Sequence, residues 1–221
     1  MSRFPKSLAF ASLVAVLALS ACADKNELAI DAGGVGQRIT RSICPAVAVP
    51  TYLGDVTLFN PPSSHAAAAI DVVGALTDIR ADCNGDSEAP TLDSNVTFRV
   101  DARRENVQGA RDVTFPYFAT IVRGGTNIVS KQVGQVTLHF ADGQARASAT
   151  ASAHASIQRS VATLPEAVRN QITRKRRPTD ADASVDPLAD PKVRNAVNSA
   201  SFELLLGFQL DDAQLAYNAT R

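Results

Sequence analysis

Three histidines are the first side chains to consider for metal binding or catalysis. His65, His139 and His154 lie far apart in the sequence, and none is joined to a second histidine or a cysteine at the spacing of a zinc site. A metal centre or a catalytic triad would need the fold to bring them together. We therefore expect no metal site.

A stretch of oxygen-bearing side chains is the second candidate. Asp82, Asn84, Asp86 and Glu88 occupy every second position, and calcium takes six to eight oxygen ligands. The spacing does not match an EF-hand loop, and Cys83 lies inside the stretch. A polar turn is the preferred interpretation, with a calcium loop as the alternative.

Motifs of common enzyme classes are missing from the chain. It contains no Gly-x-Ser-x-Gly elbow, no His-Glu-x-x-His pair and no Ser-x-x-Lys motif. We predict that the protein is not an enzyme and needs no cofactor. An enzyme whose site forms only in the folded chain is the weaker alternative.

The densest charge cluster is the basic run Arg174, Lys175, Arg176 and Arg177. It could contact anionic lipid headgroups or lipopolysaccharide phosphates, because each cation near such a surface contributes about 1 kcal/mol. It also suits the C-terminal end of a helix, where the helix dipole favours positive charge. The helix-end interpretation is preferred, and the anionic surface remains the alternative function.

The first 22 residues have the three parts of a secretory signal. Arg3 and Lys6 begin it, residues 8–19 are uncharged and mostly apolar, and Leu-Ser-Ala-Cys22 ends it. An apolar run of about 12 residues is too short to span a bilayer core of about 30 Å. The ending resembles the lipobox of bacterial lipoproteins, which implies removal of residues 1–21 and acylation of Cys22. An ordinary signal peptide ending near a cysteine is the alternative.

The lipobox resemblance implies a place in the cell envelope, with the membrane as a partner through the lipid on Cys22. Two or three acyl chains hold a protein essentially permanently, because each buried methylene contributes about 0.8 kcal/mol. In enteric lipoproteins an aspartate directly after the acylated cysteine favours the inner membrane. Here Ala23 holds that position and Asp24 follows. The resemblance therefore favours the outer membrane, facing the periplasm.

Assigning Cys22 to the lipid leaves Cys44 and Cys83 as a pair in an oxidising compartment. A bond between them would close a loop of about 40 residues, for which chain entropy gives a stabilisation of about 4 kcal/mol. We predict a structural disulfide, with two free thiols or a redox pair as alternatives.

Charge and size narrow the class of protein further. The chain has 22 basic and 22 acidic residues, and loss of Arg3 and Lys6 with the signal leaves 20 against 22, a formal charge of −2. A nucleic-acid-binding protein would show a basic surplus, so we exclude that class. About 200 residues remain, which is enough for one domain.

A period of two dominates residues 45–155 and predicts strands. Val96, Phe98 and Val100 alternate with polar residues, as do the alanines at odd positions of 145–155. Alanine favours helices intrinsically, but only a strand places all of these alanines on one face. About seven strands joined by short turns predict a mainly β protein, a single antiparallel β-sandwich that is immunoglobulin-like in the broad sense.

The remaining segments are assigned around this sandwich domain, residues 42–221. Residues 22–41 contain several glycines and are expected to form a flexible tether. A helix is predicted over 165–177, a mobile polar loop over 178–191, a closing strand over 202–210 and a short terminal helix after Asp211-Asp212. The last two segments together resemble the endings of proteobacterial lipoproteins, a resemblance that implies no particular activity.

Together these observations predict a lipid-anchored envelope protein that acts as a non-catalytic binding or scaffolding module with a protein partner. That functional step rests on analogy, because β-sandwiches commonly offer edges and loops for contacts.

Overall fold

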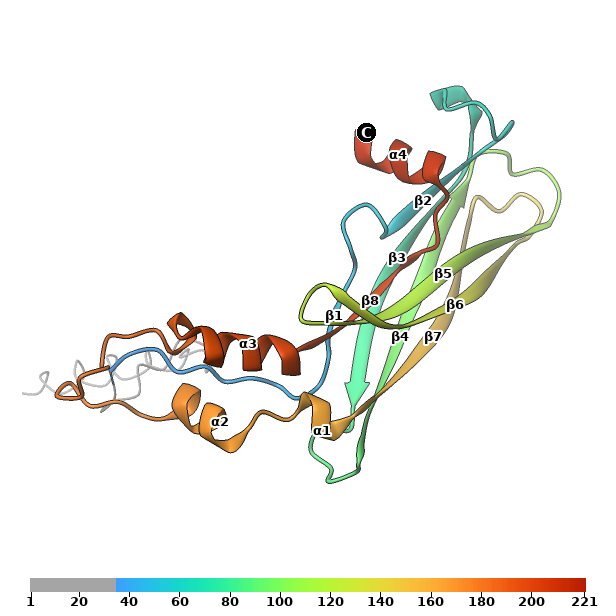
Figure 1. Cartoon of the computed structure of the whole chain (residues 1–221). Helices are drawn as coiled ribbons and strands as arrows, with labels where there is room; N and C mark the ends of the chain where they lie inside the picture. The colour runs from blue at the N-terminus through green and yellow to red at the C-terminus, as the bar shows by residue number, and fades with distance from the viewer. Residues whose placement is uncertain (1–34) are drawn as a thin grey trace, which may run out of the picture.

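The computed structural model describes residues 35–221, and Cys22 with the predicted signal lies outside the described residues. Two four-stranded sheets pack face to face, and helices lie at both ends of the sheets (Figure 1). The strands are β1 (Ala46–Ala48), β2 (Asp55–Phe59), β3 (Ile70–Cys83), β4 (Thr91–Arg104), β5 (Arg111–Arg123), β6 (Asn127–Phe140), β7 (Arg146–Gln158) and β8 (Phe202–Phe208). The helices are η1 (Ala67–Ala69), α1 (Arg159–Ala162), α2 (Glu166–Thr173), η2 (Pro187–Ala189), α3 (Pro191–Ala200) and α4 (Asp212–Thr220).

The strand order confirms the predicted sandwich. One sheet has the order β1-β8-β5-β6 and the other β2-β3-β4-β7. All neighbouring strands are antiparallel except β1 and β8, which are parallel. The likeness to immunoglobulin domains is one of architecture, because β2, β3 and β4 follow one another as a meander within a single sheet.

The alanine-rich segment forms a strand, as its two-residue period predicted. β7 pairs with β4 along its whole length, and the three central inward alanines lie beside bulky inward residues of β4: Ala153 faces Val96, Ala151 faces Phe98 and Ala149 faces Val100. Small and large side chains therefore alternate across the pair, which allows the inner face to fill without clashes.

The core between the sheets is built from alternate residues of the long strands. Most of its fully buried members come from β4, β5, β6 and β8, which supply most of the aromatic and branched side chains. They include Phe98, Phe115, Phe140, Phe208, Leu92, Ile121, Leu138, Leu204 and Leu206. This single core places the eight strands in one structural unit.

The predicted disulfide is present between Cys44 and Cys83, with a Cα–Cα distance of 6.2 Å. It joins the segment before β1 to the end of β3. Gly85 lies directly against it, because a Cβ at this position would stand 2.6 Å from the sulfur of Cys44. The turn after β3 therefore closes over the disulfide.

We call residues 35–41 and 159–200 the helical lobe. It has a second, smaller core of Leu164, Ile172, Val193 and Ala200, with Ile39 packed against it. Figure 1 shows α2 and α3 extending beyond one end of the sheets, with the blue segment that begins at residue 35 running between them. The lobe therefore forms a projection from the sandwich.

The predicted flexible tether is wrong for its last seven residues, 35–41, which are part of this lobe. Ile39 donates its backbone N–H to Ile172 O at 2.9 Å, and Val35 donates to Arg176 O at 3.0 Å. Gly36 has φ +83°, and a Cβ there would lie 2.2 Å from Ala183 O. The absence of a side chain at Gly36 permits this close approach of two backbone segments, so the glycine does not mark a flexible linker here.

The helix predicted over 165–177 is shorter in the structure, because α2 ends at Thr173 and Arg174 is extended. The backbone of Arg176 instead forms a bridge with Val35. The expected loop 178–191 contains η2, and α3 begins at its last residue, Pro191. The closing strand and the terminal helix are confirmed as β8 and α4.

Candidate functional site at the β7 edge

The four edges of the two sheets differ in how well they are protected from pairing with another chain. β1 has three residues, and β2 has five and is covered by α4, whose Asn218 amide donates to Tyr52 O and Asp55 O at 2.8 Å each. β6 is long but carries Lys131 and a register shift near Ile128. Short length, covering helices, lysines and bulges are the devices that blunt sheet edges.

β7 has none of these devices. It is 13 residues long, contains no proline, and has Arg146 at its first position as its one lysine or arginine. Its outward side chains are serine, threonine or histidine from Ser148 to Ser156, and all of them are exposed. An unguarded edge of this length is a template for strand addition.

The hydrogen bonds show which backbone groups of β7 are free. Arg104 N donates to Ala145 O at 2.9 Å, so the odd positions point toward β4. Ser152 O accepts the hydroxyl of Tyr117 at 2.9 Å, which comes from the other sheet. Even-numbered residues therefore direct their N–H and C=O groups to the open side, since both groups of one strand residue point the same way.

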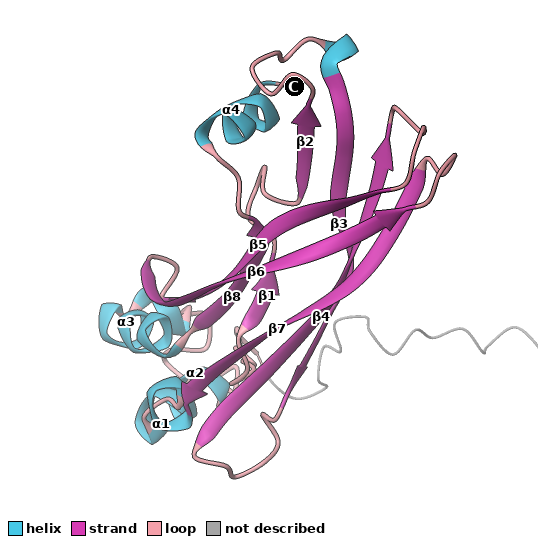
Figure 2. Ribbon diagram, turned by 90° about the vertical axis from the view of Figure 1, so that its right-hand side faces the viewer, coloured by secondary structure: helices cyan, strands magenta, loops and turns pink. Residues whose placement is uncertain are grey.

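A cleft separates the edges of β6 and β7. Figure 2 shows the two strands leaving their shared turn together and separating toward the helical lobe, and among the described residues no hydrogen-bonded register joins them. The cleft has a cavity of about 300 Å³ lined by Gln132, Gly134, Ser152 and His154, among others. Extended polypeptide could enter here along β7.

Tyr117 spans this cleft and holds the two sheets together. Its ring lies edge-on to Phe98, with 4.9 Å between centroids, and covers Gly134, where a Cβ would be 2.4 Å from the ring. Its hydroxyl ends on Ser152 O. Sequence analysis did not identify Tyr117, because neither partner is near it in the chain.

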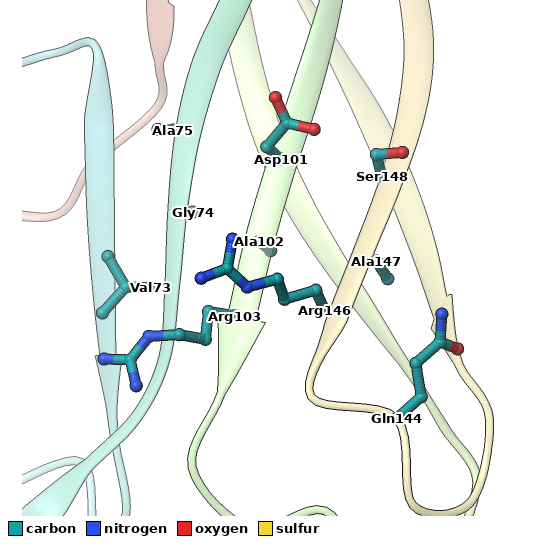
Figure 3. Close-up of a pocket in the computed structure, with 10 residues that line it drawn as sticks. All are labelled: Val73, Gly74, Ala75, Asp101, Ala102, Arg103, Gln144, Arg146, Ala147 and Ser148. Carbon is teal, nitrogen blue, oxygen red and sulfur yellow. The ribbon is translucent and has the colours of Figure 1, made fainter.

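The outer face of β3, β4 and β7 carries a second feature, an open hollow of about 630 Å³. Arg103 and Arg146 lie directly opposite each other in the β4–β7 register. Figure 3 shows both guanidinium groups reaching toward β3. Arg103 pairs with Glu105 at 2.7 Å, whereas no ion pair joins Arg146 to any described residue. Like charges placed opposite each other are unfavourable, so this pair favours an anionic group.

Asp101 is the carboxylate in the hollow and is already engaged. Thr77 donates to it at 2.6 Å and Arg99 at 3.0 Å, and these contacts lower its pKa. Asp101 therefore stays ionised and bound to Arg99, and it leaves Arg146 available for an anion from outside.

The histidines and the acidic turn do not assemble into a site. His139 contacts Asp112 at 2.6 Å, His154 lies 3.6 Å from Asp93, and His65 stacks near Phe59. The described part of the chain contains no group of three or more His, Cys, Asp or Glu side chains placed to hold a metal ion.

Arg159 fills the turn that was considered as a calcium loop. Its guanidinium donates to the carbonyl oxygens of Asn84, Gly85 and Ala89 at 2.6–3.1 Å. A guanidinium cation already binds three backbone carbonyls of this turn, so the polar-turn interpretation fits this geometry. The sequence gives no signal for Arg159, since these partners are about 70 residues away.

The structure does not present the basic run as one exposed cluster. Arg176 is 2% exposed and donates to Gln37 O at 2.7 Å and to Asp182 at 3.3 Å. Arg174 binds both oxygens of Asp182, and that contact is the main cause of the lowered pKa of Asp182. Lys175 and Arg177 are exposed. Two of the four candidates therefore hold the lobe together, which corrects the picture of a freely solvated helix end.

No helix of the described residues is long and apolar enough to cross a membrane. Comparison of the chain with protein-family models, with curated proteins and with solved structures finds no match. The geometry of the chain itself therefore carries the functional argument.

Proposed function

We propose that this protein is a lipid-anchored, non-catalytic binding module of the cell envelope. Acylation of Cys22 holds it at the membrane, and the β7 edge takes an extended segment of an envelope protein as an added strand. The observation that carries this proposal is the contrast between the edges: three are short, covered or interrupted, and β7 is none of these.

The chemistry of β7 suits strand addition. Apart from Ser152 O, which accepts the Tyr117 hydroxyl, its even positions direct main-chain donors and acceptors to the open side, and these supply affinity regardless of partner sequence. Its inner side presents alanines, so an incoming strand meets little steric obstruction beside the cleft. Selectivity would then come from the side chains at the ends of the edge.

Arg146 is the side chain that would select the partner. A strand added to β7 places its own side chains beside Arg146 on the outer face, where Arg103 already lies on the other side. A carboxylate at that position would pair with a guanidinium that has no ion-pair partner among the described residues. The favoured segment is uncharged along the alanines and acidic next to Arg146.

Site-specific photo-crosslinking of the acylated protein in its own membranes tests this proposal. A photoreactive amino acid at His154 should give a discrete protein adduct, whereas the same group at Asn106, in the exposed loop after β4, should not. Thr150→Pro removes a free edge N–H without removing a bond to β4, and it should abolish the adduct. Thr150→Val keeps the N–H and should retain it.

Two results would count against strand addition. One is an adduct at His154 that survives Thr150→Pro, since backbone pairing would then be unnecessary. The other is an identical set of adducts from His154 and Asn106. Circular dichroism of Thr150→Pro checks that the sandwich is intact before the crosslinking is interpreted.

A further inference from the structure

We infer that the helical lobe is the surface of this protein that faces the membrane, where its basic side chains contact anionic lipid headgroups. The inference rests on the proposed acylation of Cys22 and adds an orientation to it. The sandwich, with the β7 edge, is then held on the side of the lobe away from the bilayer.

The lobe contacts of Val35 and Gly36, which follow Cys22 closely in the sequence, give the first argument. Residue 35 is bound to the lobe through the contacts of Val35 with Arg176 and of Gly36 with the Ala183 backbone. Val35 comes only 13 positions after Cys22. At ~3.3–3.6 Å per residue, a chain of this length spans about 45 Å at most. The lobe is therefore the part of the described structure tied most closely to the anchor.

Charge is divided sharply between the lobe and the sandwich. The lobe carries ten basic residues, namely Arg38, Arg41, Arg159, Arg169, Arg174, Lys175, Arg176, Arg177, Lys192 and Arg194. Its five acidic residues are Glu166, Asp180, Asp182, Asp186 and Asp190, which leaves a formal charge of +5. Residues 42–158 and 201–221 carry nine basic and fourteen acidic residues, a formal charge of −5.

This division orients the molecule at an anionic surface. An anionic leaflet attracts the lobe and repels the sandwich, and both effects act within a Debye length of ~10 Å at 0.1 M salt. The anchor limits the lobe to within about 45 Å of the bilayer, a distance over which the lobe repeatedly enters that range. Half-buried Arg41 and buried Arg176 add to the field although their guanidinium groups are engaged within the protein, because they have more carbonyl than carboxylate partners.

The cations that can reach lipid directly are on the exposed surface of the lobe. Arg169, Arg177 and Lys192 are exposed, and no carboxylate among the described residues pairs with their side chains. They come from α2, from the segment after it and from α3. Contact would therefore involve the lobe as a whole rather than the basic run alone.

Fluorescence quenching on reconstituted vesicles tests the orientation. The full acylated protein carries a fluorescent amino acid at Ala181 in the lobe or at Asn106 in the sandwich, and the vesicles contain a lipid with a quencher on its headgroup. With phosphatidylglycerol added to phosphatidylcholine, Ala181 should be quenched about tenfold more than Asn106, and added salt should reduce this ratio.

Two triple charge reversals test whether the position of the cations on the lobe matters, or only the total charge of the protein. Arg169→Glu/Arg177→Glu/Lys192→Glu should bring the Ala181 quenching down to the level of Asn106. Arg80→Glu/Lys131→Glu/Arg221→Glu changes the total charge equally but lies on the exposed surface of the sandwich, and it should leave the ratio unchanged. Equal loss in both triple variants, or equal quenching of Ala181 and Asn106 in the unchanged protein, overturns the inference.

Flotation with pure phosphatidylcholine vesicles distinguishes a wrong orientation from the absence of the lipid anchor. A protein that is not acylated at Cys22 stays in the unbound fraction there. A protein that floats, but shows no preference of Ala181 over Asn106 on anionic vesicles, keeps its anchor and refutes the orientation.

Discussion

Arg104 is buried at the end of β4, with 1% of its surface exposed, and its guanidinium binds carbonyl oxygens rather than a carboxylate. It donates to Gln144 O and Gly109 O at 2.8 Å and to Val107 O and Ala141 O at 2.7 Å. These carbonyls belong to the loops before β5 and before β7. One side chain thus fixes both loops at the end of the sandwich.

Replacing Arg104 with lysine should destabilise the protein by about 3 kcal/mol, because an ammonium group cannot reach four carbonyls arranged around a planar fork. Urea unfolding monitored by circular dichroism measures the change in free energy. Arg103→Lys on the exposed face serves as the control and should change it by less than about 0.5 kcal/mol. Equal effects of the two variants would show that the carbonyl contacts contribute little.

Thr77 and Asp101 give a residue-scale prediction for pH. The hydrogen bond from Thr77 is the main cause of the lowered pKa of Asp101, with Arg99 contributing further. A carboxyl group whose pKa is lowered by folding stabilises the protein above its unfolded pKa of about 3.9, and this stabilisation is lost as the pH falls below that value. Thr77→Ala should therefore be less stable than the unchanged protein at neutral pH, and the difference should shrink in acid.

Urea midpoints at neutral pH and well below pH ~3.9 check this sign. A gap between Thr77→Ala and the unchanged protein that stays constant across the range would mean that the hydroxyl acts through packing and not through the Asp101 carboxylate. The titration of the Asp101 side chain, followed by NMR, gives an independent measure of the pKa.

At the scale of elements, local periodicity predicted the strands well and the helical lobe poorly. The period of two places Val96, Phe98 and Val100 inward whatever they pack against, so β4 and β7 could be identified from sequence. The end of α2 depends instead on Arg176, whose partners are Gln37 and Asp182. Gln37 lies 139 residues from Arg176, and a pair so distant leaves no periodic signal in the chain.

Part of the candidate site could likewise be predicted from the sequence, and part of it could not. The uncharged alternation of β7 is visible in the sequence, but its being an edge is not, because edge position depends on which strands pair. The opposition of Arg103 and Arg146 likewise follows from the β4–β7 register, across an intervening turn and two strands of the other sheet. The sequence alone identifies β7 as a strand but does not determine that it lies at the edge of its sheet.

The terminal helix α4 offers a prediction at this scale. Asp211 accepts the backbone N–H of Gln214 at 2.8 Å, and the Gln214 side chain accepts the N–H of Asp211 at 3.0 Å, which completes a capping box. Asp211→Ala should cost about 1 kcal/mol and loosen the cover over β2. Hydrogen exchange at β2 should rise in this variant and stay unchanged in the exposed-turn control Asp86→Ala.

At the scale of the whole molecule, a formal charge of zero conceals two regions of opposite sign. Residues 159–200 alone carry eight basic and five acidic residues, and Arg38 and Arg41 join them only because the fold assigns residues 35–41 to the helical lobe, far in sequence from α2 and α3. That assignment also makes the lobe the connection between Cys22 and the sandwich. The proposed orientation is therefore a property of the assembled chain, whereas the proposed anchoring residue, Cys22, is a prediction from the sequence alone.

The anchor is tested by Cys22→Ala. Without a thiol at this position no diacylglycerol can be attached, and about 0.8 kcal/mol per buried methylene of membrane affinity is lost. The variant should lose incorporation of radiolabelled palmitate and move from the membrane fraction to the soluble fraction after washing with high salt. The wash uses high salt because salt screens the attraction between the basic lobe and anionic lipid, which could otherwise hold the variant at the membrane without its lipid. Cys44→Ala/Cys83→Ala removes the disulfide but keeps Cys22, and it should still incorporate palmitate, so retention of label by Cys22→Ala would place acylation elsewhere.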